Sequence, residues 1–157
     1  MLDINTPKGQ RTLEQERQVA SILLEMGLTY WNTNKRGDAP VDAVLTKGTN
    51  VMYVAETKCR DTDKRTLMNV WHGEWLVTYQ KLLELSECSR LLRVPALGLL
   101  YLTKDPLLAV VRLTDKHGEF LPRIRIERTT TQATCNGGVA NRVNAFIDMR
   151  FAHFAKP

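Results

Sequence analysis

The sequence predicts a single α/β domain, and three stretches carry this prediction. Residues 51–60 begin as an apolar run typical of a strand that is buried on both faces. Apolar residues at helical spacing precede this run at 12–26, and a second apolar run follows at 95–103. The chain of 157 residues is long enough for one domain with a sizeable core and too short for two domains by default.

The composition indicates a folded, basic protein. Hydrophobic residues at 43% and charged residues at 25% argue against extended disorder. The net charge of +5 favours a polyanionic partner, although charge alone does not separate nucleic-acid binders from other basic proteins. Three widely spaced cysteines indicate neither a disulfide framework nor a zinc site. We expect a cytoplasmic protein, because no apolar run is long enough for a membrane helix or a secretory signal.

The N-terminal part is predicted to be a basic arm followed by a helix. Residues 1–11 contain basic side chains without apolar periodicity, which is typical of a mobile arm. Thr12 is a suitable helix cap, and apolar residues then recur at helical spacing until Gly27 ends the helix. Glu16 leans toward the apolar stripe of this helix. It is either a first-turn partner of the helix dipole or an inward-facing functional acid.

A strand, a basic loop and a second strand are predicted next. Residues 28–32 are aromatic and β-prone, and they lead into an exposed loop that contains Lys35 and Arg36. Residues 40–45 have the pattern of a strand. The glycine and asparagine in residues 48–50 then favour a tight hairpin turn into the buried strand.

The hairpin places two carboxylates opposite each other. If the turn is centred on Thr49, Asp42 and Glu56 lie equally far from it on antiparallel strands, with their Cβ atoms roughly 4.5–5.5 Å apart. Two opposed carboxylates destabilise a sheet unless a cation lies between them. Their oxygens are ligands that Mg²⁺ accepts, and Lys58, one pleat further along, could orient or activate a water molecule.

An alternative register fits the same residues. If the turn is centred one residue away, Asp42 and Glu56 point to opposite faces of the sheet. Lys58 would then simply pair with Glu56, because side chains two apart in a strand share a face. The residue pattern is compatible with both arrangements.

The second half of the chain is predicted to contain a helix and several strands. Residues 67–92 have the spacing of one long or broken helix, with Gly73 as a possible kink. Its aromatic stripe (Trp71, Trp75 and Tyr79) is more typical of a core or a subunit interface than of a base-stacking platform. Strands are predicted at 95–103, 107–113, 123–128 and 143–154, with a polar loop at 129–140.

The acidic and basic residues singled out above occur in the order of a known family. Glu16 in a first helix, Asp42, and then Glu56-Thr57-Lys58 resemble the PD-(D/E)xK nuclease superfamily, and most of all archaeal Holliday-junction resolvases and related phage nucleases. Residues 16–28, 54–60 and 93–102 resemble the family's opening helix, motif strand and later core strand. Two departures are the Pro40-Val41 pair before the aspartate and the lack of a clear counterpart to the loop serine of many resolvases.

The resemblance implies a restriction-endonuclease-like fold. Its core would begin α-β-β-β-α-β and would form a central mixed sheet flanked by helices. In a single nuclease domain, residues 1–11 would be the basic arm, 12–103 the catalytic core and 104–157 a β-rich C-terminal elaboration.

The resemblance also implies an activity: Mg²⁺-dependent hydrolysis of DNA phosphodiester bonds, with Mn²⁺ as a substitute, by a homodimer of prokaryotic or phage origin. Asp42 and Glu56 would bind the metal together with the backbone carbonyl of Thr57, and Glu16 would act through water or a second metal. Lys58 would position or activate the attacking water. The basic residues expected to contact DNA are Lys35, Arg36, Arg60, Lys64 and Arg65.

Three functions are compatible with this pattern. The first is an endonuclease selective for branched DNA in recombination or repair. The second is a flap, single-strand or restriction-type nuclease with the same chemistry, and the third is a nucleic-acid-binding module that does not cleave. The presence of all four catalytic side chains, Glu16, Asp42, Glu56 and Lys58, favours the two enzymes.

Overall fold

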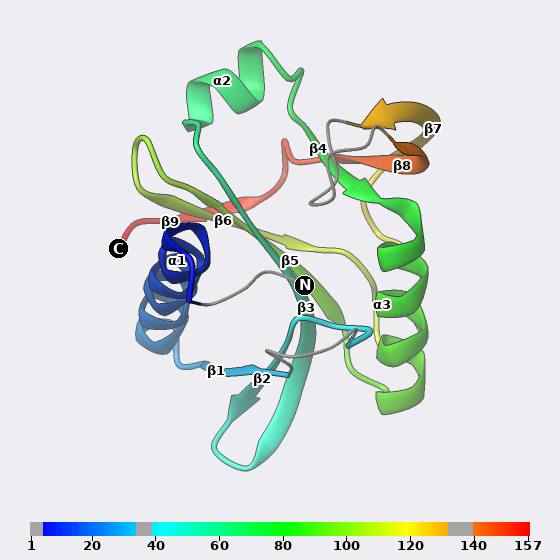
Figure 1. The fold of residues 1–157 in the computed structure, drawn as a ribbon. Helices are drawn as coiled ribbons and strands as arrows, with labels where there is room; N and C mark the ends of the chain where they lie inside the picture. The colour runs from blue at the N-terminus through cyan, green and yellow to red at the C-terminus, as the bar shows by residue number, and fades with distance from the viewer. Residues whose placement is uncertain (1–4, 34–38, 132–139) are drawn as a thin grey trace.

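A six-stranded mixed sheet forms the centre of the molecule, with helices on both of its faces (Figure 1). The computed structural model describes residues 5–33, 39–131 and 140–157. In spatial order the central sheet consists of β1 (Thr29–Asn32), β2 (Ala43–Lys47), β3 (Asn50–Arg60), β5 (Ala96–Leu102), β6 (Leu107–Arg112) and β9 (His153–Ala155). β3 and β5 run parallel, and the other neighbouring pairs run antiparallel. The predicted α/β class with a central mixed sheet is confirmed.

Two different layers cover this sheet. α1 (Pro7–Glu25) packs on one face through Val19, Ile22 and Leu23. The other face is covered by α3 (Tyr79–Leu92) and by a second, antiparallel sheet in the order β4 (Glu74–Thr78), β8 (Ala140–Asp148) and β7 (Ile124–Thr131). α2 (Lys64–Asn69) and β4 are inserted before α3, so the predicted order α-β-β-β-α-β holds with one insertion. Among the described helices, none is long and apolar enough to cross a membrane.

The first helix begins at Pro7, so the prediction of a start at Thr12 is wrong. Thr6 is the N-cap, and its side-chain oxygen accepts a hydrogen bond from the backbone N–H of Gly9 at 3.1 Å. Proline at the first helical position is a favourable start signal, because its missing N–H has no intrahelical partner there. Residues 7–11 of the predicted arm are therefore helical, and residues 1–4 lie outside the described part of the chain.

The predicted helix over 67–92 is broken, which was one of the two alternatives, but the break contains a strand that was not predicted. α2 ends at Asn69, and the chain then turns through His72 (φ 56°) and Gly73 (φ 70°) before it enters β4. Left-handed residues cannot continue a right-handed helix. Burial in β4 alternates, with Trp75 and Val77 inward. Trp71 lies in the turn before β4, Trp75 in β4 and Tyr79 at the start of α3, so the three do not form one helical stripe. Trp75 belongs to the core, which is one of the two roles considered for this stripe.

The C-terminal third belongs partly to the central sheet. β6 and β9 extend that sheet and are therefore part of the core. Only β7 and β8, which lie in the second sheet, fit the description of residues 104–157 as an elaboration of the core. The predicted final strand over 143–154 is divided, because β8 ends at Asp148 and a turn leads to β9. Arg150 pairs with Asp148 at 2.6 Å within this turn. Of the predicted loop at 129–140, residues 129–131 extend β7, and 132–139 lie outside the described residues.

The hairpin between β2 and β3 reaches the predicted register by a different route. The turn itself is Gly48-Thr49, which pairs Lys47 with Asn50. A bulge between Leu45 and Thr46 then shifts the register by one residue. Beyond the bulge, Ala43 pairs with Ala55, which is the register counted from Thr49 although the turn is centred elsewhere. The regular pairing ends there, because the N–H of Asp42 also donates to the carbonyl oxygen of Ala55. The Asp42 carboxylate nevertheless lies close enough to Glu56 to raise its pKa.

Gly98 makes room for a tryptophan beside the centre of the sheet. It pairs with Glu56 across the parallel strands β3 and β5. A Cβ atom at Gly98 would lie 2.6 Å from Cζ3 of Trp75 and 2.9 Å from Cγ1 of Val111. The missing side chain thus lets the Trp75 ring lie against β5.

Substitution of this glycine should destabilise the protein. We expect Gly98→Ala to lower the free energy of unfolding by about 1–3 kcal/mol, because the methyl group overpacks a filled core. Urea unfolding followed by circular dichroism measures this change. In a Trp75→Leu background the same substitution should cost clearly less, and an equal cost in both backgrounds would contradict the proposed contact.

Candidate active site

Asp42 and Glu56 are neighbours at the start of β2. Asp42 directly precedes this strand, and Glu56 lies in the adjacent strand β3. The backbone N–H of Asp42 donates to the carbonyl oxygen of Ala55 at 3.0 Å. The backbone N–H of Thr57 donates to Oδ2 of Asp42 at 2.9 Å. These two bonds hold the Asp42 carboxylate in place and leave its second oxygen available to a ligand.

Glu56 is a buried carboxylate with unsatisfied oxygens. Its side chain is only 1% exposed, and neither carboxylate oxygen has a hydrogen-bond partner within the described residues. Burial raises its pKa to about 7, against an ordinary value of 4.5; Lys58 opposes this rise and Asp42 adds to it. A buried carboxylate without hydrogen-bond partners beside a second carboxylate is costly unless cationic groups compensate the two charges.

Lys58 is the cationic partner of this pair. Its Nζ atom lies 3.0 Å from Oε1 of Glu56, which is an ion-pair distance without the alignment of a hydrogen bond. Burial acts to lower the pKa of Lys58, but Glu56 and Asp42 outweigh it and the pKa is raised overall. Lys58 therefore remains an ammonium group. The carboxylates are neighbours, as in the first arrangement considered from the sequence, and do not point to opposite faces. The Lys58–Glu56 ion pair of the alternative arrangement is also present.

Thr57 directs its backbone and its side chain to different neighbours. Its side-chain Oγ1 accepts a hydrogen bond from the Tyr30 hydroxyl at 3.0 Å. In a strand the N–H and C=O groups of one residue point to the same edge. The N–H of Thr57 points to Asp42, so its carbonyl faces the same edge. This orientation is suitable for the predicted backbone ligand.

Glu16 lines the same cleft as Asp42 but does not approach Glu56. It belongs to α1, on the face of the sheet that carries Ala55, whereas Glu56 and Lys58 alternate onto the other face. Its Oε2 accepts a hydrogen bond from Nδ2 of Asn32 at 3.0 Å. In the described part of the chain, no group of three or more His, Cys, Asp or Glu side chains is arranged to hold a metal. A direct Glu16 ligand would need a rearrangement, and a water-mediated role would not.

A cleft of about 640 Å³ opens over this edge of β3. Its charged lining residues are Lys8, Arg11, Glu16, Asp42, Lys58, Arg60 and Asp61. Lys8 and Arg11 were not predicted as site residues, because the sequence pattern assigned them to a mobile arm. The Thr6-Pro7 pair was the signal that could have placed them on a helix.

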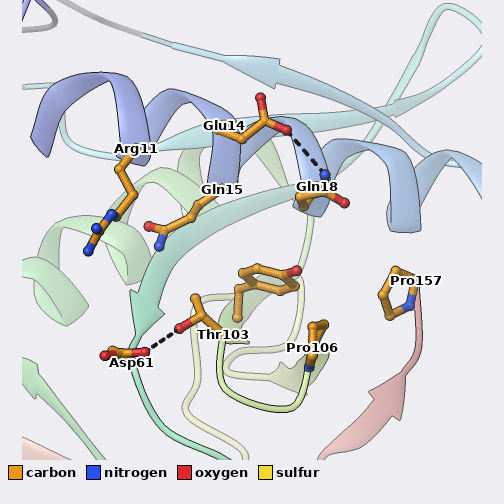
Figure 2. Close-up of a pocket in the computed structure, with 9 residues that line it drawn as sticks. Arg11, Glu14, Gln15, Gln18, Asp61, Thr103, Pro106 and Pro157 are labelled. Carbon is orange, nitrogen blue, oxygen red and sulfur yellow. Dashed lines mark hydrogen bonds between the residues drawn. The ribbon is translucent and has the colours of Figure 1, made fainter. Parts of the chain in front are cut away.

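The cleft continues as a groove along α1. A cavity of about 670 Å³ adjoins it and shares Arg11, Gln15 and Asp61 with it. Figure 2 shows Arg11 and Gln15 extending from α1 toward Asp61, which follows β3, and Thr103, which follows β5. Thr103 Oγ1 donates to Asp61 Oδ1 at 2.9 Å, which fixes the far wall of the groove.

The basic residues predicted to contact DNA have different surroundings. Arg60 lines the cleft, and its Nη1 donates to the Cys59 carbonyl at 3.0 Å. Lys64 packs its Nζ atom 4.1 Å from the centroid of the Phe154 ring, and Arg65 is exposed on α2. The predicted loop residues, Lys35 and Arg36, lie outside the described residues. The cationic lining of the cleft therefore comes from α1 and from the end of β3.

Comparison with known proteins gives a distant structural likeness. No protein-family model matches this sequence, and a search of curated protein sequences finds no match. The chain is similar to the 1.6 Å structure of Archaeoglobus fulgidus Hjc, a Holliday junction resolvase from an archaeal hyperthermophile. The TM-score is 0.48 and the identity is 16%, over 64% of this chain and 75% of that chain. The function of this protein is consequently inferred from the residues of the site itself.

Proposed function

We propose that this protein is a metal-dependent DNA endonuclease that hydrolyses phosphodiester bonds, with branched DNA as the candidate substrate. The observation that carries the proposal is the buried Glu56 carboxylate, whose two oxygens lack hydrogen-bond partners among the described residues. It lies beside Asp42 and Lys58 beneath a cleft with a basic lining. A pair of buried acids has a cost in free energy, and a catalytic cation would explain why the cost is tolerated.

Asp42, Glu56 and the Thr57 carbonyl are the groups that would hold Mg²⁺. All three offer hard oxygen atoms, which Mg²⁺ and Mn²⁺ accept, and together they leave room for bound water. A bound divalent ion supplies an activated water molecule and charge compensation for the phosphate. Glu16 would contribute only through water, since it is hydrogen-bonded to Asn32 on the other face of the sheet.

The protein's own groups position the substrate and stabilise charge. Lys58 keeps its proton and presents an ammonium group beside the carboxylates, where it would orient water and stabilise the negative charge that develops on the phosphate. Lys8, Arg11 and Arg60 line the same cleft and would bind the flanking phosphates. Because α1 begins at Pro7, Lys8 and Arg11 are held on a helix, so less entropy is lost on binding.

A cleavage assay on a panel of DNA structures tests the proposal. A four-way junction, a flap, a duplex and a single strand are incubated with Mg²⁺, Mn²⁺, Ca²⁺ or EDTA. We expect cleavage with Mg²⁺ and Mn²⁺ alone, and the preferred substrate separates the branched-DNA enzyme from a flap, single-strand or restriction-type nuclease. Sedimentation of the same preparations measures the proposed homodimer.

The Asp42→Asn variant provides the matched test of the site. We expect its cleavage rate to fall by about 10²–10³-fold, because one ligand charge is lost. Asp105→Asn, an exposed position in the turn between β5 and β6, should retain wild-type activity. If the wild-type protein binds these DNAs in EDTA and cuts none of them with any metal, the protein is a binding module and the proposal fails.

A further inference from the structure

A second pocket lies beside the cleft and shares Arg60 with it. Its volume is about 450 Å³, within the range of about 300–1,000 Å³ typical of small-molecule sites. Four large apolar side chains form its walls: Trp71, Trp75, Leu76 and Phe146. Its polar lining consists of Arg60, His72, Glu74 and Arg125. The pocket therefore has apolar and aromatic walls, and its rim contains Arg60 together with an Arg125–Glu74 ion pair.

The walls include open apolar surface. Trp71 is 36% exposed and Leu76 is 38% exposed, although both are large apolar residues. Trp75 points to the core side of β4 and is 1% exposed, so it contributes little open surface. A flat aromatic ring matches a wall that presents an exposed indole better than an aliphatic group does.

The aromatic walls are held in place by the backbone. Trp71 follows α2 in a turn in which its N–H donates to the Thr66 carbonyl at 3.0 Å. The next residue, His72, has φ 56°, and a left-handed conformation outside glycine is uncommon and costs free energy. On the opposite wall, the Arg125 guanidinium lies 4.0 Å from the Phe146 ring centroid and binds Glu74 at 3.0 Å. The pocket is largely preorganised.

The pocket is close to the carboxylates along β3. Glu56, Lys58 and Arg60 alternate on one face of this strand. At a rise of about 3.3 Å per residue, Arg60 lies about 13 Å from Glu56, which is within the span of a few nucleotides. A strand whose phosphate lies at Glu56 could therefore place a nearby base in the pocket.

We propose that this pocket binds an unpaired nucleobase of the DNA strand that occupies the cleft. This inference rests on the proposed nuclease function and narrows its substrate to DNA that contains unstacked bases. The base would stack on Trp71, and Arg60 would neutralise the phosphate between pocket and cleft. A nucleic acid is favoured over a protein partner because the pocket is continuous through Arg60 with the cleft that Lys8, Arg11 and Lys58 also line.

Binding measurements without metal test this inference independently of cleavage. Two duplexes, one fully paired and one with a single unpaired 2-aminopurine, are titrated with the protein in EDTA. We expect tighter binding to the unpaired probe and a change in 2-aminopurine fluorescence on binding. Trp71→Ala should weaken binding of the unpaired probe about tenfold, about 1.4 kcal/mol, and leave the paired duplex unaffected. Trp71→Phe should restore most of the difference.

The control is Trp31→Ala, which removes another exposed tryptophan, 58% exposed on β1, that lines none of the cavities described above. Equal losses on both probes, or no loss in Trp71→Ala, would overturn the inference. A changed oligomeric state of Trp71→Ala with unchanged DNA affinity would identify the pocket as a contact between copies of the chain, which also overturns it.

The two proposals can fail separately. If metal-dependent cleavage is absent but the Trp71-dependent preference is found, the nuclease proposal fails and the base pocket stands. If the wild-type protein cleaves DNA and shows no such preference, the base pocket fails and the nuclease proposal stands.

Discussion

Glu56→Gln should reduce metal-dependent cleavage by about 10³-fold and should change how stability depends on pH. The carboxylate is buried, and its pKa of about 7 exceeds the ordinary 4.5. At a pH between 4.5 and about 7, Glu56 is ionised in the unfolded chain and still protonated in the native state. The wild-type protein therefore loses stability as pH rises through this window, and the whole penalty is present above pH 7.

The expected size of the effect follows from the same shift. At ~1.4 kcal/mol per pKa unit, the penalty is about 3 kcal/mol without metal. The difference in unfolding free energy between Glu56→Gln and wild type should therefore grow by up to about this amount from pH 4.5 to pH 8. Urea unfolding in EDTA at a series of pH values measures it.

Added Mg²⁺ makes the comparison sharper. At pH 8 it should raise the stability of the wild type, because a ligand that binds only the native state stabilises it, and it should not affect Glu56→Gln. The exposed Glu25→Gln variant is the control, and it should follow the wild type throughout. A wild-type stability that does not fall from pH 5 to pH 8 in EDTA would contradict the raised pKa that burial gives Glu56.

Lys58→Met should separate catalysis from metal binding. The ammonium group competes with a metal for Glu56 and Asp42, so its removal should leave Mg²⁺ stabilisation intact or increased. Cleavage should nevertheless fall by about 10²–10⁴-fold, because water orientation and charge stabilisation are lost. Single-turnover cleavage rates and Mg²⁺ titrations of the unfolding midpoint measure the two effects.

The control for Lys58→Met is Lys47→Met, which removes an exposed lysine at the far end of the same hairpin. This variant should match the wild type in both measurements. If Lys58→Met loses both the stabilisation by Mg²⁺ and the cleavage activity, Lys58 supports the fold of the site. Retained cleavage would exclude Lys58 from the chemistry.

Local residue patterns correctly predicted the strands that consist of a continuous apolar run. The buried strand at 51–60 and the apolar strand at 95–103 are found, because apolar runs of this length flanked by turn residues favour β-structure. Trp71, Trp75 and Tyr79 misled the prediction, since their four-residue spacing fits one helix face although they lie in a turn, in β4 and in α3. Lys8 and Arg11 were missed because the first turns of α1 contribute little to the apolar core.

The adjacency of Asp42 and Glu56 was determined largely by the sequence, whereas the environment of the pair was decided by the tertiary structure. The hairpin pattern in the sequence placed the two carboxylates near each other. The turn is centred differently from the prediction, and the bulge between Leu45 and Thr46 restores the predicted register beyond it. Burial of Glu56 depends on nonlocal packing, which includes Trp75 against Gly98 on the neighbouring strand. The separation of Glu16 and the pocket next to Arg60 likewise arise only when distant segments meet, since contacts between them leave no local periodicity in the chain.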